Sequence, residues 1–488
     1  MCGIIGVYGN GTVSRLIYHG LQSLQHRGHS AAGMITYDGN LYTKKEAGFI
    51  SRLIRGYKNE EDFEAEHPGY VGIAHTRYST AGADDWTSLR KNAQPEYIVN
   101  PFIAACHNGN IYNGNEIMPK LKRLPRTNND IQFLLILMAN DLPSYREINF
   151  DTIVEAGTNV MTNVKGSYST LYLSVGSDKP YLLAMTDPYK VRPLVYGKKD
   201  DAWFIASESS SLKRLGITEF KDVNSGSILS FDPKNDGPVE HQIVKKKKHH
   251  CMFEYIYFAD PDSWIEGISV HKVRVELGKK LYEENPIDAD IVVPVPESGR
   301  RYAIGYSHAS NTPIEEGLRK YKKVRSFILQ TQEQRDELAE MNMAAINAAV
   351  DGKDVVVTDD SLIRGTNIKK IIKKLRGAGA KKVHVRIGCP PLIAPCYLGI
   401  DMRSKKEFIA VDKDGGIRPW DEIAEIVGAD SLAYSSMKAL RSVIIGDRDD
   451  IDICAGCLDF PCGYPEDMQA DLKELSKKDA DGVRAYEC

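Results

Sequence analysis

The stretch Val355-Val-Val-Thr-Asp-Asp-Ser-Leu-Ile-Arg-Gly-Thr366 decides the fold of the second half of the chain. It opens with an apolar run typical of a buried strand, and a helix is predicted just after it, over Ile368–Arg376. Two carboxylates, Asp359 and Asp360, stand where the strand ends. A strand that passes through a short loop into a helix is typical of a parallel α/β sheet, whose binding sites lie at the carboxyl ends of its strands.

Apolar runs on both sides of this stretch extend the same pattern. Ile291–Val295 and Val383–Ile387 are continuous apolar segments of strand length, and they alternate with helical segments. We therefore predict an α/β parallel-sheet domain over residues 251–445. A cysteine-containing C-terminal segment, 446–488, follows it and shows little strand pattern.

The first 240 residues follow a different pattern. Strand-length runs such as Gly3–Tyr8 and Val71–His75 are separated by turns, and helices are predicted at Ser14–Gln25 and Ile131–Met138. This half is predicted to be an α+β domain with antiparallel sheets. The basic stretch Lys245–His250 after it is predicted to be a solvated connector, with a phosphate or nucleic-acid patch as the alternative.

The composition is that of a soluble globular protein with more than one domain. Of 488 residues, 42% are apolar and 26% are charged, and the net charge is −3. Binders of nucleic acid or anionic membranes normally carry an excess of basic residues, so we expect neither partner. No apolar run approaches the ~18 residues of a membrane helix, and no signal peptide is predicted. The nine cysteines favour a reducing compartment, and we expect a cytoplasmic protein.

Cys2 follows the initiator methionine directly. Removal of Met1 would leave Cys2 with a free α-amino group, whose pKa is ordinarily about 7.7–8.0, beside a thiol with a pKa of about 8.5. The amine can then act as general base for its own side chain. Position alone is weak evidence for a nucleophile, so the motifs that accompany Cys2 carry the argument.

Four motifs in a fixed order accompany this cysteine. They are Met1–Gly6, Gln25–Gly28 with Ala31–Gly33, Gly72–Thr80 and His107–Asn110. Together they resemble the glutaminase domain of the class II glutamine amidotransferases. The resemblance implies an N-terminal-nucleophile (Ntn) hydrolase sandwich, with antiparallel sheets between helices, over residues 1–240.

The same resemblance implies roles for individual residues. Cys2 would attack the glutamine amide and form a γ-glutamyl thioester with release of ammonia. Asn108 and the backbone N–H of Gly109 would form the oxyanion hole. Arg77 would hold the glutamine α-carboxylate, and Asp130 its α-amino group. No catalytic role is predicted for the two histidines in these motifs, which we interpret as structural; they are His26 and His107.

The 355–366 stretch also predicts a phosphate site. Backbone N–H groups of its loop and the N-terminus of the next helix suit a phosphate, and the two carboxylates suit a sugar diol. The stretch resembles the 5-phosphoribosyl 1-pyrophosphate (PRPP) signature of type I phosphoribosyltransferases. The residues implied for PRPP are Asp359, Asp360, Ser361, Arg364, Gly365, Thr366 and Ser298, and those implied for Mg²⁺ are Ser298, Asp359 and Asp360.

Fused in this order, the two halves resemble the glutamine PRPP amidotransferase family. Further stretches support this resemblance: Asp187–Pro188, Arg192–Pro193, Ala206–Glu208, Phe253–Ala259, Pro294–Gly299, Arg325–Ile328 and Gly428–Leu432. It implies that ammonia from glutamine attacks C1 of PRPP and gives 5-phosphoribosylamine, pyrophosphate and glutamate, the first step of purine synthesis. It also implies an apolar ammonia channel, Mg²⁺, a homodimer or homotetramer, and inhibition by nucleotides.

The transferase half departs from the family pattern at several positions. In the segment 335–343, Glu340 and Asn342 stand where the family carries cations; Asp260 replaces an Arg, and Glu297 an Asp. These departures leave two alternatives open. One is a paralogous amidotransferase with another phosphorylated acceptor, and the other is a regulator that binds PRPP or a nucleotide. The intact glutaminase motifs argue against the regulator.

The spacing Cys454-x-x-Cys457 is that of a chelating pair, which by itself fits zinc, an iron–sulfur cluster or no metal. One branch of the family holds a [4Fe–4S] cluster with two such cysteines and two distant ones, which Cys251 and Cys396 match. The resemblance therefore implies a structural [4Fe–4S] cluster. The remaining cysteines are predicted to be extra or unliganded: Cys389 and Cys462 near the set, Cys106 in the core, and Cys488 at the end.

Overall fold

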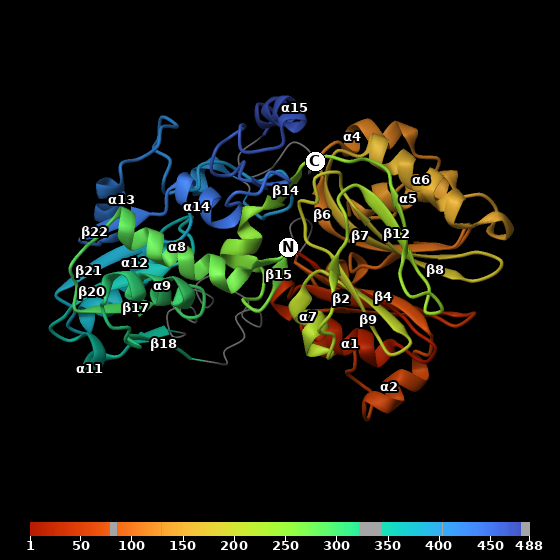
Figure 1. Cartoon of the computed structure of the whole chain (residues 1–488), viewed down its shortest axis with the longest axis horizontal. Helices are drawn as coiled ribbons and strands as arrows, with labels where there is room; N and C mark the ends of the chain where they lie inside the picture. The colour runs from red at the N-terminus through yellow and green to blue at the C-terminus, as the bar shows by residue number, and fades with distance from the viewer. Residues whose placement is uncertain (79–84, 128, 322–342, 403, 480–488) are drawn as a thin grey trace.

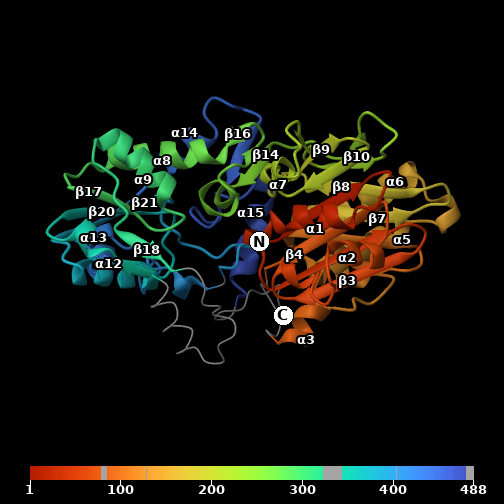
Figure 2. The ribbon, with the colours of Figure 1, turned by 90° about the horizontal axis from the view of Figure 1, so that it is seen from below.

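The computed structural model describes residues 1–78, 85–127, 129–321, 343–402 and 404–479. Two groups of elements lie side by side, one built on antiparallel sheets and the other on a parallel sheet (Figure 1). The N-terminus lies at the junction between the two groups in two perpendicular views (Figure 1; Figure 2). The start of the chain is therefore held between both halves.

A seven-stranded antiparallel sheet forms one layer of the N-terminal half. In spatial order its strands are β11 (Lys221–Asp222), β9 (Val195–Lys199), β10 (Ala202–Ala206), β1 (Gly3–Tyr8), β4 (Val71–Arg77), β2 (Ala31–Tyr37) and β3 (Leu41–Ala47). The predicted first strand has the same bounds as β1. Its central place explains why both of its faces are apolar.

A six-stranded antiparallel sheet packs against the first. In spatial order its strands are β13 (Val239–Gln242), β12 (Ser227–Phe231), β8 (Pro180–Thr186), β7 (Gly166–Val175), β6 (Ile103–Ile111) and β5 (Glu96–Ile98). Side chains of both sheets share one core, in which Ile4 and Leu171 take part. The two sheets thus form a sandwich.

Helices cover the outer faces of the sandwich and make it four layers thick. α1 (Ser14–Gln22) packs on the seven-stranded sheet, where it meets Ile5. α5 (Ile131–Asp141), whose residues are apolar and buried nearly all round, packs on the six-stranded sheet. The other helices of this half are α2 (Glu60–Glu66), α3 (Trp86–Lys91), α4 (Gly114–Ile117), α6 (Phe150–Asn163) and α7 (Ser209–Arg214). This architecture is the predicted antiparallel sandwich.

The C-terminal half is built on a four-stranded parallel sheet. Its strands, in spatial order, are β17 (Ile291–Pro294), β20 (Asp354–Asp359), β21 (Lys382–Ile387) and β22 (Ser431–Tyr434). Its helices are α8 (Val270–Glu284), α9 (Arg300–Ser310), α11 (Asn347–Val350), α12 (Thr366–Gly377), α13 (Trp420–Val427) and α14 (Met437–Ile444). α8, α9 and α14 lie on one side of the sheet and α12 and α13 on the other (Figure 2). The predicted parallel α/β sheet is present.

A short parallel ribbon differs from the sequence prediction. β14 (Lys248–Cys251) pairs with β23 (Ile451–Cys454), so the end of the predicted solvated connector is a strand, and His250 in it is buried. The C-terminal segment, predicted to have little strand, supplies β23 and also α15 (Glu466–Ser476). The two strands lie about 200 residues apart in the sequence, and no local pattern predicts such a pairing.

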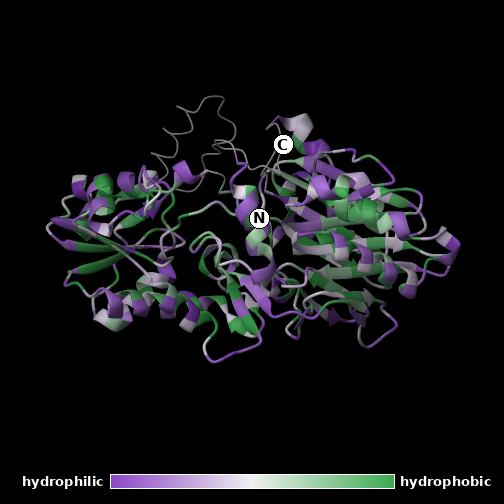
Figure 3. Ribbon diagram, turned by 90° about the horizontal axis from the view of Figure 1, so that it is seen from above, coloured by the Kyte–Doolittle hydropathy of each residue, from purple (hydrophilic) through white to green (hydrophobic). Residues whose placement is uncertain are grey.

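Short elements complete the described part of the chain. They are η1 (Gln25–Arg27), η2 (Ile50–Arg52), η3 (Met118–Lys120), η4 (Tyr145–Glu147), η5 (Glu254–Phe258), η7 (Lys405–Glu407), β15 (Trp264–Ile265), β16 (Ile268–Ser269), β18 (Leu318–Lys320) and β19 (Met343–Ala345). Hydrophobic residues concentrate on the strands of both halves (Figure 3). Within the described ranges, no helix has both the length and the apolar character needed to cross a membrane.

Candidate active sites

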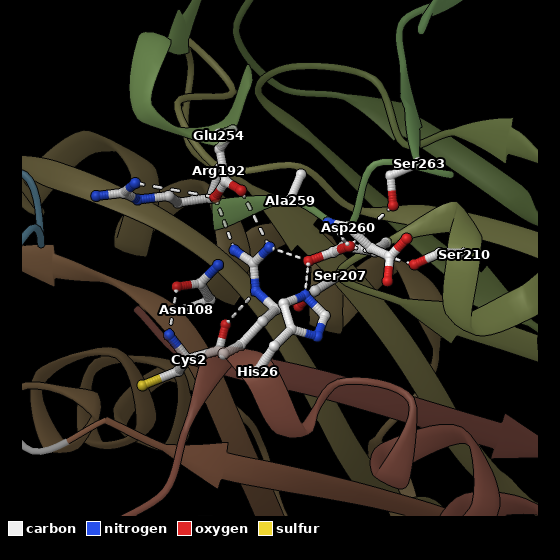
Figure 4. Close-up of polar contacts among 12 residues, drawn as sticks. Cys2, His26, Asn108, Arg192, Ser207, Ser210, Glu254, Ala259, Asp260 and Ser263 are labelled. Atoms are coloured by element: carbon white, nitrogen blue, oxygen red, sulfur yellow. Dashed lines mark hydrogen bonds and ion pairs between the residues drawn. The ribbon is translucent and has the colours of Figure 1, made fainter. Parts of the chain in front are cut away.

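Cys2 lies just before β1, at the junction of the two halves (Figure 4). Its backbone N–H donates to Oδ1 of Asn108 on β6 (3.1 Å). Asn108 is buried, and its Nδ2 has no hydrogen-bond partner among the described residues. A buried donor without a partner normally costs about 1–3 kcal/mol, so an unpaired amide beside a nucleophile suggests a donor kept for a ligand.

Met1 precedes Cys2 and is buried at this junction. The Met1 side chain is buried, and burial lowers the pKa of its amino group to about 6. While Met1 is attached, the nitrogen of Cys2 belongs to a peptide bond and cannot serve as a base. The free amine that the predicted chemistry requires therefore depends on removal of Met1.

Asp130 and Arg77, the two residues predicted to bind glutamine, lie near one another. His107 Nε2 lies 3.2 Å from Asp130 Oδ1, and the backbone N–H of Ile111 donates to Oδ2 (3.2 Å). Burial raises the pKa of Asp130, but His107, this N–H group and Arg77 together hold it below the ordinary value. His107, predicted to be structural, thus positions a predicted substrate ligand. Of the four motifs, Ser79 and Thr80 lie outside the described residues.

Arg27 is fully buried and joins the N-terminus to both halves. Its Nε donates to the Cys2 carbonyl (2.9 Å), and its Nη1 donates to Glu208 (2.5 Å). Both Nη atoms also donate to Glu254, at 3.0 and 2.7 Å. No role is predicted from sequence for these three charged residues, although each lies in a quoted motif. The signal that could have found them is a charge inside an otherwise apolar motif.

Glu208 is a carboxylate with several polar contacts at this junction. Besides Arg27, it pairs with His26 (2.8 Å) and accepts from Ser263 Oγ and the Asp260 N–H (both 2.8 Å). Burial raises the pKa of Glu208, but His26 and Arg27 lower it far more, to well below the ordinary value. Glu208 therefore stays ionised and ties the sandwich to the transferase half.

Asp260, one of the departures from the family pattern, belongs to this junction. Its carboxylate pairs with Arg214 of α7 (3.1 Å). Of the other departures, Glu297 is exposed and lies 3.4 Å from Arg300. Glu340 and Asn342 lie outside the described residues, as does the Arg325 segment. The Asp that stands at position 260 in place of the family's Arg therefore makes a contact between the two halves.

The predicted phosphoribosyl residues gather at the carboxyl ends of β17 and β20. Ser298, in the loop after β17, donates through Oγ to Asp359 Oδ1 (2.9 Å). Ser361 Oγ donates to Asp360 Oδ2 (2.5 Å). Gly299 permits this approach, because a Cβ on it would stand 2.0 Å from the Thr358 carbonyl oxygen. The loops after β17 and β20, which are far apart in the sequence, thus lie together at the carboxyl-terminal edge of the parallel sheet.

Electrostatics at this edge favour a positively charged or hydroxyl-bearing ligand. Burial raises the pKa of Asp359 and Asp360, and the neighbouring carboxylate raises that of Asp359 further. Two adjacent carboxylates, of which Asp360 is buried and Asp359 half-buried, repel each other unless a cation or hydroxyl donors lie between them. With the Ser298 hydroxyl they form a set of oxygen atoms of the kind that Mg²⁺ prefers.

The loop after Asp360 leads into the N-terminus of α12. Gly365 adopts φ +75°, a left-handed conformation that glycine takes without strain, and the exposed Thr366 opens the helix. Arg364 is exposed and pairs with Glu407 (2.8 Å). The unpaired N–H groups of this first helical turn suit a phosphate, as the sequence predicts.

Four cysteines from three segments gather around the β14–β23 ribbon. Cys251 and Cys454 are opposite one another in the β14–β23 ribbon, and backbone N–H groups of Ile393 and Ala394, shortly before Cys396, donate to the Cys457 carbonyl. Burial raises the pKa of the Cys454 and Cys457 thiols, and the nearness of Cys251 and Cys396 raises it further.

The other cysteines lie as follows. Cys106 is fully buried in the core between the sheets, as predicted, and Cys462 is exposed. Cys389 is fully buried, and its N–H donates to the Asp360 carbonyl (2.8 Å), so it lies beneath the end of β20. Cys488 lies outside the described residues.

Comparison with known proteins covers both halves. A family model described as a glutamine amidotransferase domain matches residues 76–214. The amidophosphoribosyltransferase of Methanocaldococcus jannaschii is 36% identical over 481 residues, which is 94% of this chain and 96% of the relative. The corresponding Bacillus subtilis protein is 34% identical and covers 96% of this chain and 95% of its own.

Solved structures agree in fold. The B. subtilis glutamine PRPP amidotransferase, in complex with ADP and GMP, matches with a TM-score of 0.80 at 32% identity and covers 94% of this chain and 96% of its own. A structure described as the allosteric regulatory enzyme of purine biosynthesis matches with a TM-score of 0.81. The predicted fold and family are thereby confirmed. The chain belongs to the amidophosphoribosyltransferase family.

Proposed function

We propose that this chain hydrolyses glutamine at Cys2 and transfers the ammonia to C1 of PRPP, which gives 5-phosphoribosylamine, pyrophosphate and glutamate. The observation that carries the proposal is the junction itself: Arg27 contacts the Cys2 carbonyl on one side and Glu254 of the transferase half on the other. The two half-reactions are therefore mechanically connected. Family membership across 94% of the chain supports the same activity.

The glutaminase half-reaction follows from the residues around Cys2. Once Met1 is removed, the free amine of Cys2 takes the thiol proton, and Sγ attacks the carbonyl carbon of glutamine. Asn108 Nδ2 and the Gly109 N–H stabilise the oxyanion. Arg77 holds the α-carboxylate, and Asp130 the α-ammonium. The amine returns the proton to the leaving ammonia, and water then hydrolyses the thioester.

The transferase half-reaction takes place at the ends of β17 and β20. The 361–366 loop and the first turn of α12 bind the 5′-phosphate. Asp359 and Asp360 accept hydrogen bonds from the ribose hydroxyls, and the Ser298 loop binds the pyrophosphate. Ammonia forms the bond to C1 as the bond from C1 to the pyrophosphate oxygen breaks. Bound with Ser298 and the two carboxylates, Mg²⁺ would neutralise charge on the departing pyrophosphate.

The four gathered cysteines support a [4Fe–4S] cluster held by Cys251, Cys396, Cys454 and Cys457. Cys251 and Cys454 are opposite one another in the β14–β23 ribbon, and backbone hydrogen bonds join the segment before Cys396 to Cys457. Four cysteine ligands are the usual set for such a cluster. Such a cluster would pin the C-terminal segment to β14.

The domain bounds and the assembly complete the proposal. Residues 1–240 form the glutaminase domain, 251–445 the phosphoribosyltransferase domain, and 446–488 a C-terminal segment joined to the phosphoribosyltransferase domain through the cysteines. By resemblance, the active form is a homodimer or homotetramer in the cytoplasm. Light scattering of the purified protein measures that assembly.

The experiment that tests the function follows two products at once. Purified protein is incubated anaerobically with glutamine and Mg²⁺, with and without PRPP, and glutamate and pyrophosphate are measured together. Equal amounts of both, appearing only with PRPP, support the proposal. Glutamate without pyrophosphate contradicts it and favours an amidotransferase with another phosphorylated acceptor, which the exchanged cations at 335–343 would explain. If neither glutamate nor pyrophosphate is formed, the result contradicts the proposal and favours a regulator.

A further inference from the structure

Arg192 is a buried cation that the proposed mechanism does not use. Its side chain is fully buried at the junction of the two halves (Figure 4). Nη2 donates to the carbonyl oxygen of Leu398, whereas Nε and Nη1 have no hydrogen-bond partner within the described ranges. Unpaired guanidinium N–H groups in a dry interior are costly, so this arrangement requires a physical reason.

Arg192 lies between a carboxylate and the segment that carries Cys396. Nη1 lies 4.0 Å from Glu254 Oε1 on one side. On the other side, Leu398 lies two residues after Cys396, and the Leu398 N–H donates to the Cys396 sulfur (3.4 Å). Burial lowers the pKa of Arg192, but Cys251, Glu254 and Cys396 raise it above the ordinary value. The guanidinium therefore stays charged between a carboxylate and the thiol set.

The same carboxylate leads to the nucleophile. Glu254 Oε1 accepts from Arg27 Nη2 (2.7 Å), and Arg27 Nε donates to the Cys2 carbonyl (2.9 Å). Every side chain in this path is almost fully buried, with 0–1% exposed. Buried ion pairs are weakly screened and hold their geometry firmly. A continuous path of polar contacts thus runs from the thiol set through Arg192, Glu254 and Arg27 to Cys2.

We propose that Arg192 is a positioning residue shared by two sites: its guanidinium supplies the charge and the N–H donors that four thiolates require, and it fixes Glu254, which orients Cys2 through Arg27. This inference rests on the proposed cluster at the four cysteines. A [4Fe–4S] centre with four thiolates carries net negative charge, which a buried cation stabilises. The two unpaired N–H groups of Arg192 are then the donors of hydrogen bonds to sulfur.

The test compares Arg192→Met with Arg192→Lys in the full-length protein, purified anaerobically. Iron content, visible absorption, the cluster's reduction potential and its lifetime in air are measured before activity. In Arg192→Met we expect a more negative potential and a shorter lifetime in air, because the reduced, more negative cluster loses its cation. We also expect glutamine hydrolysis to lose about tenfold to a hundredfold in kcat with KM unchanged, since Arg77 and Asp130 are untouched.

Arg192→Lys separates charge from geometry. Lysine keeps the positive charge but lacks the planar fork that reaches both Leu398 and Glu254. We expect its potential to lie near that of the wild type, while its kcat stays reduced. If Arg192→Met does not retain its cluster, Arg192→Lys carries the test alone: retained cluster and reduced kcat support the inference, and wild-type kcat overturns it.

A matched control and two negative outcomes complete the design. Lys190→Met removes another fully buried cation from the same segment, one that pairs with Asp222 and Glu266 instead (3.1 and 2.5 Å). It should lower stability without moving the cluster potential. If the wild type contains iron and the reduction potential of the cluster is the same in Arg192→Met, this inference is overturned but the proposed cluster is not. A wild type that binds no iron overturns the proposed cluster, and this inference with it.

Discussion

Asn108→Ala should lower kcat for glutamine hydrolysis by about 10²–10³-fold, which is the effect of removing one oxyanion-hole donor, or about 2.7–4 kcal/mol. The structure indicates why stability should change little. Asn108 Nδ2 has no hydrogen-bond partner among the residues described, so its loss breaks no bond of the folded state. Oδ1 loses only the bond from the Cys2 N–H (3.1 Å), worth about 1 kcal/mol. KM for glutamine should stay unchanged, because Arg77 and Asp130 remain.

Asn113→Ala is the matched control, because Asn113 is a buried asparagine of the same domain with both side-chain groups bonded. Its Nδ2 donates to the Asn163 carbonyl (2.9 Å), and its Oδ1 accepts from the Lys165 N–H (2.9 Å). Truncation leaves two buried groups unpaired, at about 1–3 kcal/mol each. We expect the opposite pattern: lower stability and normal kcat.

The assay measures glutamate release at saturating PRPP over a range of glutamine concentrations, and unfolding in urea for each variant. The reasoning is refuted if Asn108→Ala keeps kcat within about threefold of the wild type while the protein is folded. An equal loss of kcat in both variants would also contradict it, since that result would trace the effect to general destabilisation of the domain.

Three further predictions concern the other sites. Asp360→Asn should abolish pyrophosphate release, because it removes one of the two carboxylates that face the ribose, yet keep PRPP-independent reaction of Cys2 with an alkylating glutamine analogue; loss of both would contradict this. Cys454→Ser should lower iron content at least severalfold and destabilise the β14–β23 ribbon, as measured by iron analysis and limited proteolysis; full iron content would rule out the proposed ligand set. The pKa of Glu208 is depressed in the folded state, so its contribution to stability is present above the unfolded value of about 4.3 and is lost as pH falls below it. The Glu208 carboxylate also raises the pKa of His26 in the folded state, and His26 gains its charge as pH falls from 7 to 5. The difference in unfolding free energy between the wild type and Glu208→Gln should therefore grow from pH 7 to 5 and shrink in more acidic solution; a difference that shrinks between pH 7 and 5 would contradict this assignment.

Local patterns in the sequence predicted the elements around both sites. The apolar runs at β1 and β21 were recognisable because strands buried on both faces read as continuous apolar segments. The carboxylates at the end of β20 were placed correctly for a related reason: a strand, a short loop and a helix in sequence fix where the loop lies. Cys2 was predicted to be the nucleophile from its position in the chain and from the motifs that accompany it.

Long-range contacts were beyond these patterns. β14 pairs with β23 from about 200 residues away, and a basic stretch that reads as a solvated connector ends in that strand. The sequence around Lys248 or Ile451 does not predict this pairing, because strand pairing depends on which surfaces meet when the rest of the chain packs. The four cysteines meet for the same reason.

By itself, the sequence determined the two kinds of sheet and predicted the nucleophile and the phosphate loop, since each depends on residues close together in the chain. Only the tertiary structure decided how the two halves communicate. Arg27, Glu254 and Arg192 come from three distant segments, and their charges are tolerated in the interior because each has an oppositely charged neighbour there. These opposite charges meet only once the two halves have packed, so no local pattern in the sequence predicts their pairing.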